Sequence, residues 1–331
     1  MGRTERSEIV LDCPTSEQPG WEMSRHRAVS FFVAFLLLLP AGVVAQSAAP
    51  NPALWRIRNG ASTVYVFGSL HILPQSFKWR APEIESAIAS SDTFVFEVPV
   101  DNAATARQKE FIVKNGLLPA GASLRKVLNR IEFDTYSRVL IGAGLKPEHF
   151  TRYRPWLAAV IVGLAYVHRR DLTMLRGVDD EIIEYAQSEG KELRYLENIE
   201  DQMKLLVMGD DLAQVRALKR QLISLPKSVS HTEELVHTWA QGDAERFAAM
   251  IEQDFAGHVE AQDLLISNRN SNWLPTVTEL LTANKTSMVT VGAAHIGGSK
   301  GLISLLCAAG RDVERVGVNG APDTDACGRN S

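Results

Sequence analysis

Two histidines follow the same short pattern near opposite ends of the chain. Residues 64–71 (VYVFGSLH) and 287–295 (SMVTVGAAH) each join an apolar run to a Gly-x-x-His motif that ends at His71 or His295. One such motif is common by chance, but two in the same setting indicate a repeated element. Imidazole is the commonest metal ligand, and two histidines with one carboxylate leave a position open for water. The pattern therefore predicts a divalent-metal site between His71 and His295.

Glu97 is the best candidate for the carboxylate. It lies in the apolar run TFVFEV (93–98), where a charge is costly unless it is paired or bound to a metal. The alternative is an ion pair with an arginine such as Arg154 or Arg269.

Two further acidic residues lie at predicted element ends. Glu197 lies at the end of the predicted strand 193–196, and Asp179 precedes a helical pattern in GVDDEI (177–182). Each is a candidate metal ligand, general base or partner that orients a ligand. The alternative for both is a helix cap or a solvated loop.

The elements that must position these residues are strands near both ends of the chain and helices between them. A hairpin around Asn59-Gly60 precedes Gly68, and Gly292 follows the strand 288–291. Each glycine lets the chain leave its strand at an angle that a Cβ atom forbids, or lets a ligand approach closely. The other predicted strands are 93–98, 193–196 and 313–318, and the predicted helices include 82–89, 123–140, 147–169 and 179–187. This pattern predicts an α+β fold in which two strand-GxxH-helix-strand elements share one central sheet, covered by a long helical insertion (101–285), with Glu97 on the strand next to that of His71.

Composition and charge narrow the class of protein. The chain has 331 residues, 45% apolar and 22% charged, with a net charge of −4 and no basic stripe. These values are typical of a globular protein with a large core and argue against a nucleic-acid partner. The glycine-rich stretch GGSKG (297–301) lacks Walker spacing, so a P-loop site is not expected. We interpret five other histidines as surface or packing residues: His149, His168, His231, His237 and His258.

The N-terminal region is typical of an export signal. A basic segment (23–27) precedes the apolar run 28–39 and small residues up to Ala45, which predicts cleavage after Ala45. We therefore expect a leader over 1–45 with a true start at Met23, a linker over 46–53, one domain over 54–318 and a tail over 319–331. The expected location is periplasmic or secreted. The alternative is an uncleaved segment that anchors the protein to the inner membrane, which would be its only membrane contact.

Two cysteines remain after the predicted cleavage. Cys307 and Cys327 lie 20 positions apart, and an exported protein meets an oxidising compartment, so a disulfide between them is one expectation. The alternative is a buried Cys307 and a free thiol at Cys327.

The motifs taken together resemble the TraB/GumN family (TraB/PrgY/GumN), which is similar to the Tiki proteins of animals. The resemblance rests on their order: STVYVFGSLHILP (62–74), FVFEV (94–98), RPW (154–156), GVDDEI, LENIEDQ (196–202), TWAQGD (238–243), RNSNW (269–273) and VGAAHIGG (291–298). It covers residues 54–318.

This resemblance implies a divalent-metal-dependent protease, with manganese, cobalt or zinc bound by His71, His295 and Glu97. It implies a peptide or protein substrate and gives Arg269 two possible roles. Arg269 either pairs with a site carboxylate or holds a substrate carbonyl. The pairing with a carboxylate can be a purely structural ion pair.

The sequence therefore favours an exported metal-dependent hydrolase, with Glu97, Glu197 and Arg269 as catalytic candidates. The first alternative is a non-catalytic protein that binds a peptide, haem or metal, for example as an accessory to polysaccharide production or pheromone control. The second is a scaffold in which the histidines are structural.

Overall fold

The structure is a computed structural model that describes residues 50–71, 73–74, 77–168, 175–317, 321 and 323–328. The predicted leader, its cleavage site, the start at Met23 and part of the tail lie outside these residues, so those predictions stay predictions. In chain order the strands are β1 (Leu54–Asn59), β2 (Ser62–Ser69), β3 (Leu73–Pro74), β4 (Thr93–Phe96), β5 (Leu175–Arg176), β6 (Glu192–Tyr195), β7 (Thr286–Gly292), β8 (Val313–Arg315) and β9 (Thr324–Asp325).

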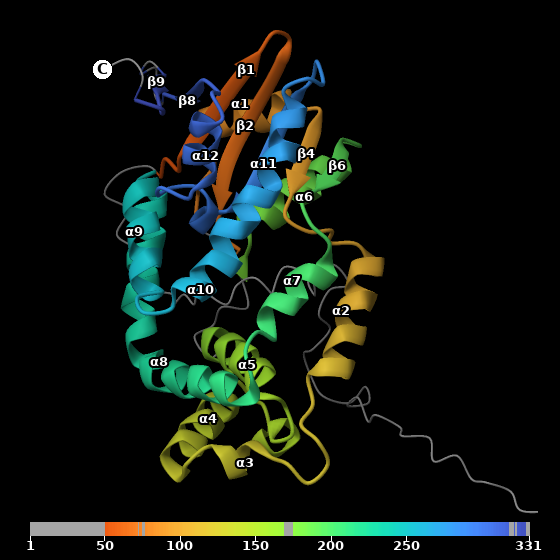
Figure 1. The fold of residues 1–331 in the computed structure, drawn as a ribbon, viewed down its shortest axis with the longest axis vertical. Helices are drawn as coiled ribbons and strands as arrows, with labels where there is room; N and C mark the ends of the chain where they lie inside the picture. The colour runs from red at the N-terminus through yellow and green to blue at the C-terminus, as the bar shows by residue number, and fades with distance from the viewer. Residues whose placement is uncertain are drawn as a thin grey trace, which may run out of the picture.

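The helices lie mostly in the middle of the chain (Figure 1). They are α1 (Pro82–Ser90), α2 (Asn102–Asn115), α3 (Leu124–Val127), α4 (Arg130–Gly142), α5 (Pro155–His168), α6 (Val178–Ser188), α7 (Ile199–Leu206), α8 (Asp211–Ala240), α9 (Ala244–Asp254), α10 (Val259–Gln262), α11 (Asn268–Leu280) and α12 (Leu302–Ala308).

A seven-stranded sheet forms the centre of the described fold, in the order β6-β4-β7-β2-β1-β8-β9. The four strands β6, β4, β7 and β2 run parallel, whereas β1, β8 and β9 join by antiparallel pairing. The carboxyl ends of the four parallel strands therefore meet at one edge. The predicted α+β fold with its two repeated elements is confirmed, because β2 and β7 are direct neighbours.

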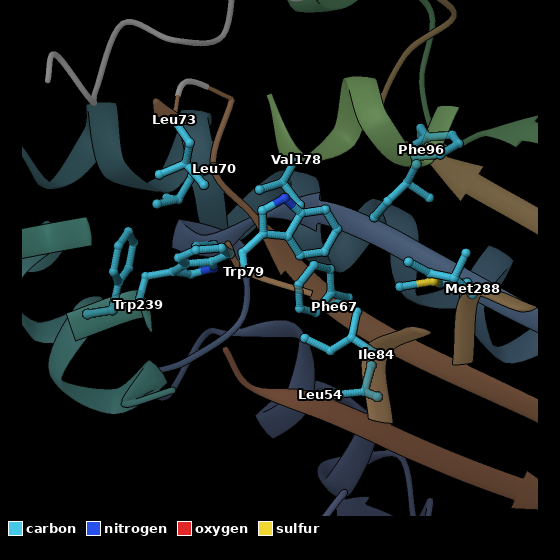
Figure 2. Packing of buried hydrophobic residues seen from close by; sticks show 14 of the residues in the cluster. Leu54, Phe67, Leu70, Leu73, Trp79, Ile84, Phe96, Val178, Trp239 and Met288 are labelled. Atoms are coloured by element: carbon cyan, nitrogen blue, oxygen red, sulfur yellow. The ribbon is translucent and has the colours of Figure 1, made fainter. Parts of the chain in front are cut away.

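Helices cover both faces of this sheet because its parallel strands are apolar on both sides. On one face α1, α6, α9 and the end of α8 pack against Phe67, Phe94 and Met288. Figure 2 shows Trp79 beside Phe67 in this layer, where their ring centroids are 5.8 Å apart. On the other face α11 and α12 pack against Val66 and Val289.

The inserted helices form a second lobe as well as a cover. The helices α3, α4, α5 and the first half of α8 share a separate apolar cluster that includes Leu124, Tyr136 and Leu218 (Figure 1). The helix α8 belongs to both parts. It changes direction along its length (Figure 1), and it contains Pro226, a residue type that kinks helices. Only part of the insertion therefore covers the sheet.

Two predicted helices are interrupted, so those boundaries were wrong. The predicted helix 123–140 is split between α3 and α4, because Asn129 caps α4 in a reciprocal pair with Glu132. The predicted helix 147–169 begins as a 3₁₀ turn at Pro147–Phe150, and α5 starts only at Pro155. Proline fixes the first turn of a helix but cannot continue one that is already running.

The strand of Glu97 is also placed differently from the prediction. The strand β4 pairs with β7 and β6, so β7 separates it from β2 and from His71. The chain order alone favoured β4 beside β2, but the second repeated element enters between them. Glu97 follows the last strand residue, Phe96, rather than lying within the strand.

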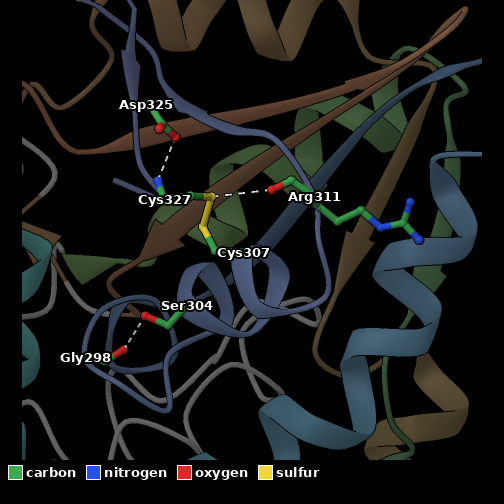
Figure 3. Close-up of a disulfide and its surroundings, with 6 residues drawn as sticks. All are labelled: Gly298, Ser304, Cys307, Arg311, Asp325 and Cys327. Atoms are coloured by element: carbon green, nitrogen blue, oxygen red, sulfur yellow. Dashed lines mark hydrogen bonds between the residues drawn. A yellow bond between two sulfur atoms is a disulfide. The ribbon is translucent and has the colours of Figure 1, made fainter. Parts of the chain in front are cut away.

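A disulfide joins the end of α12 to the last described segment. Cys307 and Cys327 are bonded, with 5.4 Å between their Cα atoms (Figure 3). The Cys327 sulfur lies 3.4 Å from the carbonyl oxygen of Arg311. The bond holds β9 beside β8, where Arg56 also pairs with Glu314 and Asp323.

In the described part of the chain, no helix combines the length and the apolar character that a membrane span requires.

Replacing both cysteines (Cys307→Ser with Cys327→Ser) should lower the free energy of unfolding by about 2–4 kcal/mol, because the bond closes a loop over 20 positions. Urea unfolding followed by circular dichroism measures the change. The unaltered protein in dithiothreitol is the control and should unfold at the same urea concentration as the double variant. Identical midpoints for the oxidised protein and the double variant would contradict the prediction.

Candidate active site

The four parallel strands each deliver one ionisable side chain to the same edge of the sheet. Ser69 at the end of β2 pairs with Gly292 at the end of β7, and Phe96 of β4 pairs with Tyr195 of β6. Directly after these ends come His71, His295, Glu97 and Glu197. Ligands of open sheets bind outside the carboxyl ends of the strands, so this cluster lies where a binding site is expected.

His71 is held from behind by Asp179. The backbone N–H of Val178 donates to the Leu70 carbonyl, which brings the start of α6 against the end of β2. Asp179 Oδ1 then lies 3.1 Å from His71 Nδ1, while His71 Nε2 is buried without a hydrogen-bond partner. Burial alone would lower the pKa of His71, but the Asp179 carboxylate outweighs it and raises that pKa to about 9. Asp179 therefore orients the His71 ring through Nδ1, and Nε2 is the ring nitrogen that has no partner.

His295 is held by an amide instead of a carboxylate. Asn270, fully buried on α11, accepts from His295 Nδ1 at 2.8 Å and donates to the carbonyl oxygens of His295 and Lys300. The proton therefore lies on Nδ1, and the Nε2 lone pair faces Arg269 Nη1 at 3.0 Å. Burial, together with the Arg269 charge, lowers the pKa of His295 to about 3. His295 is therefore a neutral acceptor at Nε2.

Glu97 is a buried, ionised carboxylate between these groups. Its Oε1 accepts from the Gly292 N–H at 2.7 Å, and its Oε2 accepts from Arg269 Nη2 at 2.6 Å. Burial acts to raise the pKa of Glu97, but Arg269, with both histidines and the Gly292 N–H, lowers it to about 2. The expected alternative of an ion pair with Arg269 is therefore present, whereas Arg154 pairs with Asp211 elsewhere.

Arg269 uses all five of its N–H groups inside this cluster. Nε and Nη2 bind both oxygens of Glu197 at 3.1 and 2.6 Å, and Nη2 also binds Glu97. Nη1 donates to His295 and to the Leu265 carbonyl at 3.1 Å. Because guanidinium has five donors, none is left for a substrate carbonyl in this arrangement. Burial raises the pKa of Glu197, and Arg269 acts in the opposite direction.

Three residues of the cluster were not singled out from the sequence. Gln202 on α7 donates to Glu97 at 3.4 Å and to Glu197 at 3.3 Å. Trp273 on α11 lies against both Arg269 and His295, with centroid separations of 4.6 and 4.5 Å. Asn270 is the third. All three lie within the segments LENIEDQ and RNSNW that carried the family resemblance, so their presence in those motifs was the available signal.

The two motif glycines allow close approach rather than an unusual backbone angle. Neither has a positive φ. A Cβ atom on Gly68 would lie 3.0 Å from Ile296 and 3.1 Å from the backbone of Ala293, so Gly68 lets the two repeated elements meet. A Cβ atom on Gly292 would lie 3.3 Å from Glu97 Oε1, 3.4 Å from His71 Nε2 and 3.7 Å from His295 Cδ2. The space above Gly292 is therefore where these three side chains converge.

The fit of this cluster to a metal ion depends on which atoms are free. Among the described residues, no three His, Cys, Asp or Glu side chains form a ready metal-binding group. His71 Nε2 is nevertheless a buried atom without a partner, and it shares the space above Gly292 with Glu97 Oε1. His295 Nε2 carries a lone pair but is engaged by Arg269. The donor set fits a cation, provided that Arg269 gives up one contact.

The fold and this cluster define a class of α+β protein with a two-histidine, two-carboxylate site. Comparison with known proteins then identifies the family, because the model of the TraB/PrgY/gumN family matches residues 53–315. The chain belongs to this family. It is also similar to a protein of Amphimedon queenslandica described as a metalloprotease TIKI homolog, at 23% identity. That match covers 86% of this chain and 66% of the relative. No solved structure matches the chain.

Replacing Arg269 by methionine should lower the free energy of unfolding by about 3–5 kcal/mol, because it leaves Glu97 and Glu197 buried without their cation. Urea unfolding at neutral pH measures the loss. The matched control is Arg194→Met, whose partly exposed ion pair with Glu279 should contribute less than about 1 kcal/mol. Equal losses in the two variants would contradict the prediction.

Proposed function

We propose that this chain is a metal-dependent hydrolase that cleaves peptide bonds in a compartment outside the cytoplasm. The observation that carries the proposal is the buried, unpartnered Nε2 of His71, which faces the same space above Gly292 as Glu97 Oε1. Membership of the family and the similarity to a protein described as a metalloprotease support this proposal. The disulfide supports the location, because such bonds persist in oxidising compartments.

Charge in the cluster also favours a cation. Glu97 and Glu197 face the Arg269 guanidinium and Asp179 faces His71, so three carboxyl groups accompany two positive groups, the guanidinium and the protonated His71 ring. A divalent ion at His71 Nε2 would replace that proton. Manganese, cobalt and zinc are the ions to test, since imidazole and carboxylate ligands suit all three.

The roles of the residues follow from their contacts. His71 Nε2, Glu97 Oε1 and His295 Nε2 would hold the ion, which would supply an activated water and polarise the scissile carbonyl. Asp179 and Asn270 orient the two imidazoles. Glu197 is the carboxyl group suited to take up and return a proton, because its burial raises its pKa.

Replacing His71 by alanine should remove bound metal and peptide hydrolysis together, because it deletes the buried Nε2 atom that would bind the metal and that has no hydrogen-bond partner. Elemental mass spectrometry of the purified protein and cleavage of a peptide library with added manganese, cobalt or zinc measure both. The control is His231→Ala, which breaks a similar histidine–carboxylate pair with Asp254 on the surface, 2.8 Å apart. Stoichiometric metal and full cleavage in the His71 variant would refute the assignment.

A protein that holds metal at this site but cleaves no peptide would favour the non-catalytic alternative. The observation that favours this alternative is that all five N–H groups of Arg269 already have acceptors, which leaves no donor for a substrate carbonyl in this arrangement. A Soret band after addition of haem would identify the haem-binding version.

Replacing Gly292 by alanine should reduce metal binding at least tenfold while the protein stays folded. Its backbone (φ −53°, ψ 140°) accepts alanine, but the added methyl group enters the space shared by Glu97 and His71. Isothermal titration with zinc measures the affinity, and thermal unfolding checks the fold. The control is Ser69→Ala, a buried change at the position that pairs with Gly292 in the sheet. Unchanged zinc affinity in the Gly292 variant would count against a site at this position.

A further inference from the structure

Arg269 and a metal ion require the same atom. The amide of Asn270 takes the proton-bearing Nδ1 of His295, so the ring has a single lone pair, at Nε2. Arg269 Nη1 now donates to that lone pair at 3.0 Å. His295 Nε2 lies 3.9 Å from Glu97 Oε1, too far for a hydrogen bond between them. A cation bound to both atoms would therefore take the direction that the Nη1 hydrogen now occupies.

Arg269 can lose its contact with His295 Nε2 while its other contacts hold the side chain in place. Its two hydrogen bonds to Glu197 come from Nε and Nη2, and its hydrogen bond to Glu97 also comes from Nη2. Neither involves Nη1. After losing His295, Nη1 still donates to the Leu265 carbonyl, and Trp273 still lies against the guanidinium. Only one of the five N–H groups then loses its acceptor, and a solvent or substrate oxygen is needed to replace it.

We propose that Arg269 is a positioning residue that occupies His295 Nε2 in the metal-free protein and sets the metal affinity by competing for that lone pair. This inference rests on the proposed function of the same cluster. Competition differs from simple charge repulsion, because a competitor acts only while His295 is present. A cation that merely repels the metal would act equally whether or not residue 295 is a histidine.

Replacing Arg269 by lysine separates these two effects. Lysine keeps the positive charge near Glu97 and Glu197 but lacks the planar fork that reaches both Glu197 and His295. Zinc affinity is measured by isothermal titration in four proteins: unaltered, Arg269→Lys, His295→Ala and the double variant. We expect Arg269→Lys to raise the affinity at least tenfold, about 1.4 kcal/mol, when His295 is present and less than twofold in the His295→Ala background. The control is Arg194→Lys, which should leave the affinity unchanged.

A measurement on the unaltered protein keeps the test decisive if Arg269→Lys does not fold. The side-chain nitrogen signals of Arg269 and His295 are followed by nuclear magnetic resonance as zinc is added. We expect the His295 Nε2 signal and one Arg269 Nη signal to change together, while the Arg269 Nε signal stays close to its starting position. Movement of His295 with no change at Arg269 would overturn the inference.

The titration distinguishes failure of this inference from failure of the proposed function. An equal effect of Arg269→Lys with and without His295, or weaker binding in Arg269→Lys, overturns the inference while zinc binding by the unaltered protein still supports the metal site. Zinc binding by Arg269→Lys alone supports the inference and overturns a metal-dependent function for the unaltered protein. Absence of binding in all four proteins overturns both.

Discussion

The burial of Arg269 between Glu97 and Glu197 is the constraint on which the site depends. Arg269 and Glu97 are buried and Glu197 is largely buried, and each charge is tolerated only because the others neutralise it and hydrogen bonds satisfy it. The guanidinium ties three distant elements together, since Glu97 follows β4, Glu197 follows β6 and Arg269 lies on α11. The neighbouring strands β4 and β6 of the parallel part of the sheet are therefore fixed to the helix that covers one face of it.

The two histidines show how similar motifs acquire different chemistry. His71 and His295 both follow a strand and a glycine, yet one is backed by a carboxylate and the other by an amide. The Asp179 carboxylate favours a protonated His71 ring, whereas burial and the Arg269 charge favour a neutral His295 ring, so their pKa values separate to about 9 and about 3. Of the four imidazole nitrogens in this pair of histidines, only His71 Nε2 has no hydrogen-bond partner. This asymmetry comes from α6 and α11, outside the repeated elements.

Much of the fold was accessible from sequence because its signals are local. The apolar runs before Gly68 and Gly292 predicted neighbouring strands, and β2 and β7 do pair in parallel. The interruption at Asn129 was missed because a helix cap competes with helical continuation by only a few tenths to about 2 kcal/mol. The position of β4 beyond β7 was missed because chain order does not record which later strand enters the sheet. Asp179 was a candidate metal ligand, general base or orienting partner, and it contacts His71 at Nδ1.

The sequence by itself determined the family, the repeated strand-GxxH elements and the residues that gather at the site, because residue type and spacing along the chain carry those signals. Only the tertiary structure decided how those residues share their partners. Arg269 is 172 positions from Glu97 and 72 from Glu197, and no local pattern specifies that five N–H groups will find five acceptors. Hydrogen-bond partnership is set by the packing of α11 against the ends of β4, β6 and β7, so which nitrogen of each histidine is engaged could be read only after the sheet was assembled.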